Sequence, residues 1–165
     1  MRVPIRKGGK YTHLKPDPHL TEEKFNEIKN ELARLKQSQP AAISEVKRLA
    51  ELGDFSENAA YQIAKGRLRG INQKILDMEE HLKRAVIIEP VKNSATVQLG
   101  SRVTVEVEGQ QKTFLILGSS ETDPSQGVIS HHSPIGAALL GQPVGRSVTV
   151  KLKDKEVEYK IIKIE

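Results

Sequence analysis

Two carboxylates lie three residues apart in the segment Leu52-Gly53-Asp54-Phe55-Ser56-Glu57-Asn58-Ala59-Ala60-Tyr61. On the first turn of a helix, side chains at this spacing face the same side, so Asp54 and Glu57 could share one divalent cation. Mg²⁺ prefers six oxygen ligands and is usually held by one or two protein carboxylates together with phosphate and water. The pair alone is therefore an incomplete and weak magnesium site, which a second molecule would have to complete.

A purely structural role explains the same residues. Asp54 as an N-cap, with Glu57 three residues later, forms a capping box that stabilises a helix by about 1 kcal/mol. Ser56 is an alternative N-cap, or a group that orients water or substrate. The turn alone does not decide between these roles.

The residues on either side of this segment predict two long helices. Thr21 is the predicted N-cap of the first, and Gly53 ends it. Apolar side chains recur at spacings of three and four along both helices. In the first they are Phe25, Ile28, Leu32, Leu35, Ala42, Val46 and Leu49, and in the second Tyr61, Ala64, Leu68, Ile71, Ile75, Met78 and Leu82. Because the connection is short, residues 20–90 should form an antiparallel coiled-coil hairpin about 45 Å long, with the two acids at its tip.

The pattern changes from helical to alternating beyond residue 90. Strands are predicted at 102–108, 111–117, 146–152 and 156–164, paired about turns at Gly109-Gln110 and Asp154. Ser133 as N-cap and Pro134 at the first helical position mark one short helix between the pairs. The predicted fold class is thus α+β, with the helical hairpin followed by a small antiparallel-sheet domain at 91–165. Residues 1–19 carry five basic residues without periodicity and predict a flexible basic arm.

Composition narrows the classes of function. The net charge is +5, and the residues up to Pro90 carry 17 basic and 13 acidic side chains, so the hairpin is the part expected to meet phosphates. Aromatic residues are 4% of the chain with no Trp, which argues against a base-stacking platform. There is no Cys and no long apolar run, so we expect a soluble, cytoplasmic and unprocessed protein.

The stretch from Gly53 to Tyr61, continued by Ala64-Lys65, resembles the tip signature of the bacterial Gre transcript cleavage factors (GreA/GreB). The resemblance extends to Leu20-Thr21 at the start of the first helix, to Pro40 at an interruption within it, and to Ser133-Pro134-Ile135 followed by Ala138-Leu139. It covers all but the arm of residues 1–19.

The resemblance implies a C-terminal domain of FKBP-like topology that docks at the secondary channel of bacterial RNA polymerase. The hairpin would enter that channel and reach the RNA 3′ end extruded in a backtracked complex. The factor would act as a monomer and would not be an enzyme itself, but would stimulate the polymerase's own cleavage of the transcript. Mg²⁺ would be shared with the polymerase and not held tightly by the free protein. The resemblance also implies DNA binding.

Residue roles follow from the same resemblance. Asp54 and Glu57 become shared magnesium ligands with Ser56 beside them. Phe55, Asn58 and Tyr61 become tip contacts, although Tyr61 is also one of the apolar positions at which the two helices should meet, here called the seam. Lys65, Arg67 and Arg69 could follow the RNA phosphates, or form an ordinary solvated face. Ser133, Pro134 and Ile135 would contribute to polymerase docking. His131 and His132 replace a more usual polar or acidic residue there, and we expect no zinc site because neighbours on an extended segment point to opposite faces.

Three other interpretations remain open. A member of the same family could occupy the channel without promoting cleavage, although both acids are retained. The FKBP-like topology suggests a peptidyl-prolyl isomerase, but beyond residue 90 the only aromatic residues are Phe114 and Tyr159. The heptads could also form a dimeric coiled coil.

Overall fold

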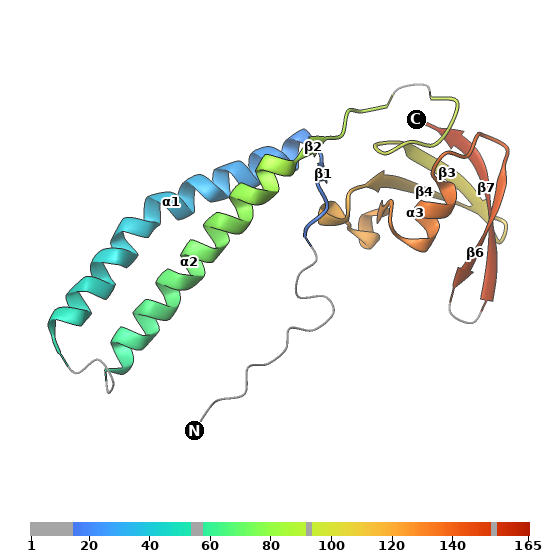
Figure 1. The fold of residues 1–165 in the computed structure, drawn as a ribbon. Helices are drawn as coiled ribbons and strands as arrows, with labels where there is room; N and C mark the ends of the chain where they lie inside the picture. The colour runs from blue at the N-terminus through green and yellow to red at the C-terminus, as the bar shows by residue number, and fades with distance from the viewer. Residues whose placement is uncertain (1–14, 54–57, 92–93, 153–154) are drawn as a thin grey trace.

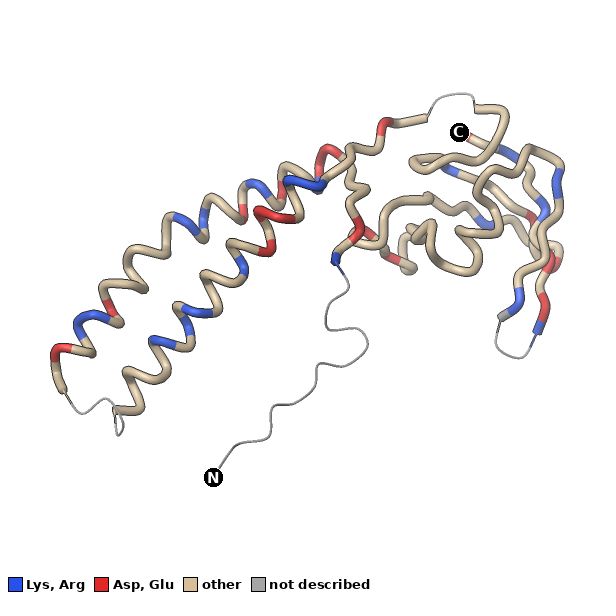
Figure 2. The backbone as a smooth tube through the Cα atoms, viewed as in Figure 1, with Lys and Arg blue, Asp and Glu red and all other residues tan. Residues whose placement is uncertain are grey.

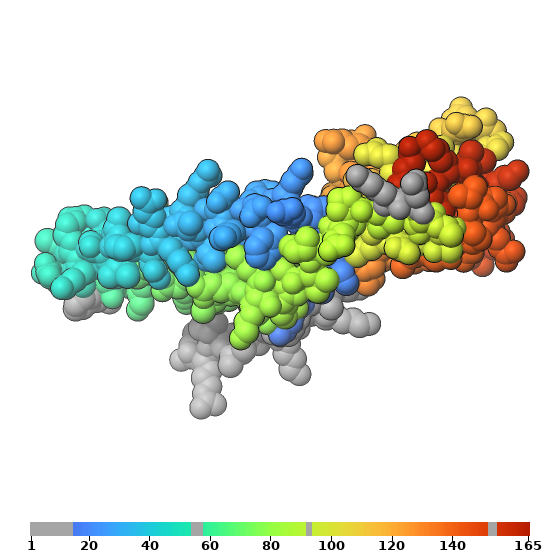
Figure 3. Space-filling view, turned by 90° about the horizontal axis from the view of Figure 1, so that it is seen from above, coloured from blue at the N-terminus to red at the C-terminus, as the bar shows by residue number. Residues whose placement is uncertain are grey.

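The computed structural model describes residues 15–53, 58–91, 94–152 and 155–165. Helices α1 (Glu22–Glu51) and α2 (Ala59–Arg84) lie side by side as an antiparallel hairpin. The hairpin projects from a globular C-terminal domain as a narrow rod (Figures 1 and 3). With 30 residues in α1, this rod is about 45 Å long, as the sequence predicts.

The two helices meet along the predicted apolar positions. Every seam residue named from the sequence is buried or half-buried, while nearly all other positions of the two helices are exposed. Gln39 takes the heptad position between Leu35 and Ala42, and its side-chain amide donates to the Asn72 side-chain oxygen at 2.8 Å. Helix α1 continues through Pro40 without a break. The hairpin is intramolecular, so these heptads need no second chain.

The C-terminal domain contains a curled five-stranded sheet in the order β5-β4-β3-β7-β6. Its strands are β3 (Arg102–Val107), β4 (Gln110–Leu117), β5 (Val128–Ser130), β6 (Ser147–Leu152) and β7 (Lys155–Ile164). The predicted antiparallel pairs are confirmed, and helix α3 (Pro134–Leu139) packs against the sheet. Val103, Val105, Ile116, Leu139 and Ile161 form the fully buried centre of the core.

One strand departs from the antiparallel prediction. Strand β5 pairs with β4 in parallel, so the sheet is mixed. The connection between them runs through two short 3₁₀ helices, η1 (Ser119–Glu121) and η2 (Pro124–Gln126). A parallel neighbour requires such a crossover instead of a tight turn, and three residues of β5 are too few to show a period in the sequence.

A second, two-stranded sheet ties the chain before α1 to the chain after α2. Strands β1 (His19–Leu20) and β2 (Val86–Ile87) pair in parallel at the base of the hairpin. The backbone N–H of Val86 donates to the Pro18 carbonyl at 2.7 Å, and that of Ile88 donates to Leu20 at 2.8 Å. Leu20 is fully buried. The last residues of the predicted basic arm are therefore packed against the folded protein, while residues 1–14 lie outside the described residues.

Two glycine-to-alanine substitutions should change stability in opposite directions. A Cβ added at Gly70, on the exposed face of α2, meets nothing within 4 Å, whereas one at Gly136 would lie 2.2 Å from the Ser130 carbonyl oxygen. We predict that Gly70→Ala raises the free energy of unfolding by about 0.5–1 kcal/mol, because alanine loses less backbone entropy in a helix. Gly136→Ala should lower it, because the backbone must shift. Urea denaturation measures both, and a less stable Gly70→Ala variant would contradict the prediction.

Candidate functional site

The two helices end at the free end of the hairpin, away from the C-terminal domain (Figure 1). Helix α1 ends at Glu51 and α2 begins at Ala59. The predicted tip residues Asp54, Phe55, Ser56 and Glu57 lie outside the described residues, so their roles stay predictions. The covalent connection nevertheless restricts them to the few residues that join the distal helix ends.

The N-cap of α2 is Asn58, whose side-chain oxygen accepts a hydrogen bond from the backbone N–H of Tyr61 at 3.1 Å. The prediction that Asp54 or Ser56 caps this helix is therefore wrong. The sequence analysis considered only Asp54 and Ser56 as caps and assigned Asn58 as a tip contact, although Asn is as good a cap as Asp or Ser. Helix α2 consequently does not need the Asp54 and Glu57 pair as its capping box, which removes the main structural explanation for these carboxylates.

The three basic residues behind the tip do not share one surface. Lys65 and Arg69 are four residues apart and lie on the same side of α2, with Lys65 Nζ 5.8 Å from the centre of the Tyr61 ring. Arg67 instead lines a groove of about 570 Å³ between the helices, together with Glu45. Hydrogen bonds from Arg48 lower the pKa of Glu45, and the charge of Arg67 contributes further. Arg67 thus faces an acidic neighbour.

Basic residues nevertheless dominate the tip-proximal part of α2. Between Ala59 and Leu76 the helix carries Lys65, Arg67, Arg69 and Lys74 and no acidic residue. Acidic side chains occur closer to the base, at Asp77, Glu79 and Glu80 (Figure 2). The half of α2 that leads to the tip is therefore positively charged.

The predicted docking residues surround the start of α3. The Ser133 hydroxyl accepts a hydrogen bond from the Gly136 N–H at 3.0 Å, which confirms its role as N-cap. Ile135 is half-buried against the domain core, whereas Pro134 is exposed. Two of the three residues thus have structural roles, and Pro134 is the one whose side chain is available to a partner.

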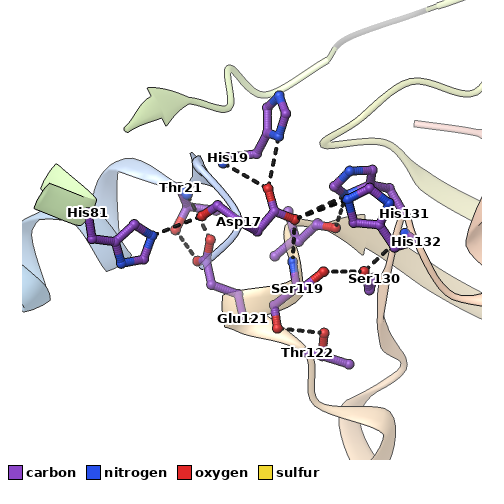
Figure 4. Close-up of polar contacts among 11 residues, drawn as sticks. Asp17, His19, Thr21, His81, Ser119, Glu121, Thr122, Ser130, His131 and His132 are labelled. Carbon is purple, nitrogen blue, oxygen red and sulfur yellow. Dashed lines mark hydrogen bonds and ion pairs between the residues drawn. The ribbon is translucent and has the colours of Figure 1, made fainter. Parts of the chain in front are cut away.

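The hairpin and the C-terminal domain meet at a polar cluster, here called the junction, between residues 17–21 and residues 118–132 (Figure 4). Asp17 is at its centre, with a side chain only 3% exposed. Its carboxylate accepts hydrogen bonds from the backbone N–H groups of Ser119 at 2.8 Å and His19 at 3.0 Å, and lies 3.0 Å from the His19 ring. Burial raises the pKa of Asp17, but these hydrogen bonds and the nearby His131 lower it more, so it stays well below its ordinary value.

The N-cap of α1 is held by the same region of the C-terminal domain. The half-buried carboxylate of Glu121 accepts from the Thr21 backbone N–H at 2.8 Å and from the Thr21 hydroxyl. The His81 ring, near the end of α2, lies 2.9 Å from the Asp17 carbonyl oxygen. Helix α1 is thereby attached to the C-terminal domain directly, and α2 is attached to it through Asp17, which accepts from Ser119. Of these residues the sequence analysis identifies only Thr21.

His131 and His132 are also part of the junction, and the extended conformation that the sequence analysis assumed for them is wrong, whereas the prediction of no zinc site stays a prediction. Their rings lie side by side, with centres 3.8 Å apart, because both residues are in a turn and not in an extended strand. Asp17 Oδ2 is 3.6 Å from His131 Nδ1 and 3.9 Å from His132 Nε2. Together these three residues form a cluster of potential metal ligands.

An intramolecular helical hairpin thus projects from a small mixed-sheet domain. Two family models match the chain. The N-terminal transcription elongation factor domain matches residues 19–87, and the GreA/GreB C-terminal domain matches residues 92–165. The chain belongs to the GreA/GreB family of transcription elongation factors.

Two curated sequence relatives agree with this assignment. The transcription elongation factor GreA of Macrococcus caseolyticus is 40% identical over 149 residues, which cover 88% of this chain and 94% of the relative. GreA of Thermodesulfovibrio yellowstonii is 38% identical over the same shares of both chains. The solved structure of GreA factor homolog 1 (Gfh1) of Thermus thermophilus is 26% identical, with 89% of this chain and 97% of that chain covered and a TM-score of 0.41.

The comparisons and the structure also bear on two further expectations, one about membranes and one about DNA binding. Within the part of the chain that the structure describes, neither long helix is apolar enough to cross a membrane. The matched families and the relatives named above do not support DNA binding, so DNA binding is not part of the proposed function.

Glu121→Ala should loosen the attachment of α1. We predict a free energy of unfolding lower by about 1–2 kcal/mol, because two hydrogen bonds to a carboxylate are lost at a half-buried site. Amide hydrogen exchange at Thr21 should become faster. Glu22→Ala removes the same charge from the exposed first turn of α1 and is the matched control. Equal exchange at Thr21 in both variants would show that Glu121 does not hold the helix.

Proposed function

We propose that this elongation factor binds bacterial RNA polymerase at its secondary channel and stimulates the polymerase's own cleavage of backtracked RNA, which rescues arrested complexes. The observation that carries the proposal is the position of Asp54 and Glu57 in the seven residues between the distal ends of two helices of 30 and 26 residues. In a family of transcription elongation factors, such a rod serves to carry its end into a partner.

The division of roles follows the two parts of the chain. The C-terminal domain, residues 91–165, docks at the channel entrance, with exposed Pro134 at the contact and with Ser133 and Ile135 shaping the turn that presents it. The hairpin, residues 20–90, enters the channel tip first. A docked base and a rod of about 45 Å together place the tip deep inside the partner.

At the tip, Asp54 and Glu57 hold a Mg²⁺ ion that the polymerase shares. Two carboxylates suit this ion, which prefers hard oxygen ligands and keeps positions for phosphate and water. When bound, the ion stabilises the negative charge that develops during phosphodiester hydrolysis. Ser56 orients water or the RNA end, and Phe55 and Asn58 contact the channel beside them. Tyr61 belongs mainly to the seam.

Lys65 and Arg69 contact the phosphates of the extruded RNA. They share one side of α2 and lie about two to three turns behind the tip. Arg67 is left out of this role because it lines the interhelical groove beside Glu45. The free factor has little nuclease activity of its own, since two carboxylates without the polymerase's ligands are an incomplete site.

The isomerase alternative is not favoured. Tyr159 is buried in the core of the C-terminal domain and Phe114 packs against that core, so neither aromatic side chain is available to line a peptide pocket. The channel-binding regulator without cleavage activity remains the alternative within the family, and the assay below decides between the two.

Substitution of the tip acids should abolish cleavage without affecting docking. In a stalled, backtracked polymerase complex, Asp54→Asn and Glu57→Gln should each lower the rate of release of short 3′ RNA fragments by at least about tenfold, because each removes a metal ligand. Glu51→Gln, at the exposed end of α1, is the control with the same loss of charge. Polymerase binding by all three variants should match that of the wild type. If wild-type protein releases no more RNA than Asp54→Asn, the factor is a non-cleaving regulator.

Substitutions on the two faces of α2 should have different effects on the salt dependence of binding. For binding to a backtracked complex, Lys65→Ala and Arg69→Ala should each reduce the slope of log affinity against log salt concentration by roughly one, because one phosphate contact is lost. Arg67→Ala removes the same charge from the groove and should leave the slope unchanged. Equal slopes for all three variants would mean that these residues form only a solvated face.

A further inference from the structure

We propose that Asp17, His131 and His132 bind a divalent transition metal ion, with Zn²⁺ as the expected ion, at the junction between hairpin and C-terminal domain. The site is separate from the tip, which offers only oxygen ligands to a metal. It does not depend on the function proposed above, because the ligands belong to the factor alone.

The ligand atoms are already near metal-binding distances. They lie within 4.8 Å of one another, and Asp17 Oδ2 is 3.6 Å and 3.9 Å from the two histidine nitrogens. A tetrahedral Zn²⁺ with bonds of roughly 2.0–2.1 Å requires ligand atoms about 3.3–3.4 Å apart. The remaining movement falls mainly to His132, whose side chain is 70% exposed although its ring lies beside that of His131 (Figure 4).

The Asp17 ligand is fixed in advance. Backbone and ring groups of Ser119 and His19 hold the Asp17 carboxylate in place, as described above. His131 Nδ1 lies 3.2 Å from the Leu117 carbonyl oxygen, so the His131 ring must turn this nitrogen away from Leu117 to bind a metal. Leu117 would keep a hydrogen-bond donor, because the backbone N–H of His131 donates to the same oxygen at 3.0 Å. Metal binding therefore leaves no buried acceptor without a partner.

Charge also favours a cation at this position. Asp17 is a nearly buried carboxylate, and among the described residues its ion-pair partners are histidines only, with no Lys or Arg. One carboxylate and two imidazoles form a ligand set typical of Zn²⁺, and imidazole disfavours Mg²⁺. The fourth ligand is water, because His19 is outside this cluster and its Nδ1, 3.0 Å from Asp17 Oδ1, holds the carboxylate.

A metal here would have a structural consequence. Its ligands come from the segment immediately before α1 and from the turn between β5 and α3. The ion would thus link the hairpin base to the C-terminal domain and fix the direction of the hairpin, in addition to the Thr21 and Glu121 contact.

The test is metal titration of the full-length protein after removal of metal by a chelator. We expect one Co²⁺ per chain with the visible absorption of tetrahedral cobalt, displacement by Zn²⁺, and no displacement by Mg²⁺. His132→Ala should weaken binding by at least about tenfold without unfolding the protein, because its side chain is exposed. His13→Ala, which changes a histidine outside the proposed ligand set, should bind like the wild type.

A second measurement reports on the junction itself. Zn²⁺ should slow amide hydrogen exchange at residues 17–21 and 118–121 in the wild type but not in His132→Ala. Wild-type protein that binds no stoichiometric Co²⁺ or Zn²⁺, or a His132→Ala variant that binds as tightly as the wild type, would overturn the proposal and leave the cluster as a hydrogen-bonded contact. Because no polymerase is present, neither result bears on transcript cleavage.

Discussion

The attachment of the hairpin to the C-terminal domain is the constraint on which the rest of this structure depends. A rod of about 45 Å converts a tilt of about 5° at its base into a displacement of about 4 Å at its tip. Catalytic groups tolerate errors of only about 1 Å before much of their effect is lost. The carboxylates of Asp17 and Glu121, which hold the backbone before α1 and its N-cap residue, therefore matter to the tip although they are far from it.

The seam between the helices supplies the second condition, a fixed register. Apolar heptads alone allow two helices to slide by a heptad with little loss of buried area, whereas a polar residue at one seam position restricts the pairing to one register. Gln39 occupies such a position and bonds Asn72 across the interface. Its energetic contribution to stability is small, because the pair is exposed, but it favours this register in addition to the short connection between α1 and α2. The connecting residues are thereby kept at the end of the rod and not along its side.

Local patterns allowed most elements to be predicted and left most of the site unpredicted. The heptads, the two β-hairpins and the Ser133 cap depend on residues a few positions apart, so the sequence contains their period or spacing directly. The contact between Thr21 and Glu121 joins residues 100 positions apart and leaves no such period. The turn at His131 and His132 exists because the chain after β5 must reverse into α3, and that reversal follows from tertiary packing. At the tip, the motif identifies the candidate residues, but with three possible caps in five positions it could not assign the N-cap to Asn58.

The proposed metal chemistries at the two ends of the hairpin differ in a way that suits their positions. Two carboxylates at the tip make a weak site that is completed only in the partner, which allows the factor to enter and leave without carrying a tightly bound ion. One carboxylate and two imidazoles at the base make a set that needs no partner, and its carboxylate is held by hydrogen bonds before an ion arrives. An ion at the base would fix the direction of the rod while leaving the ligands at the tip untouched. Loss of zinc would therefore change the position of Asp54 and Glu57 within the partner, and loss of magnesium would remove the ion that these two residues share with it.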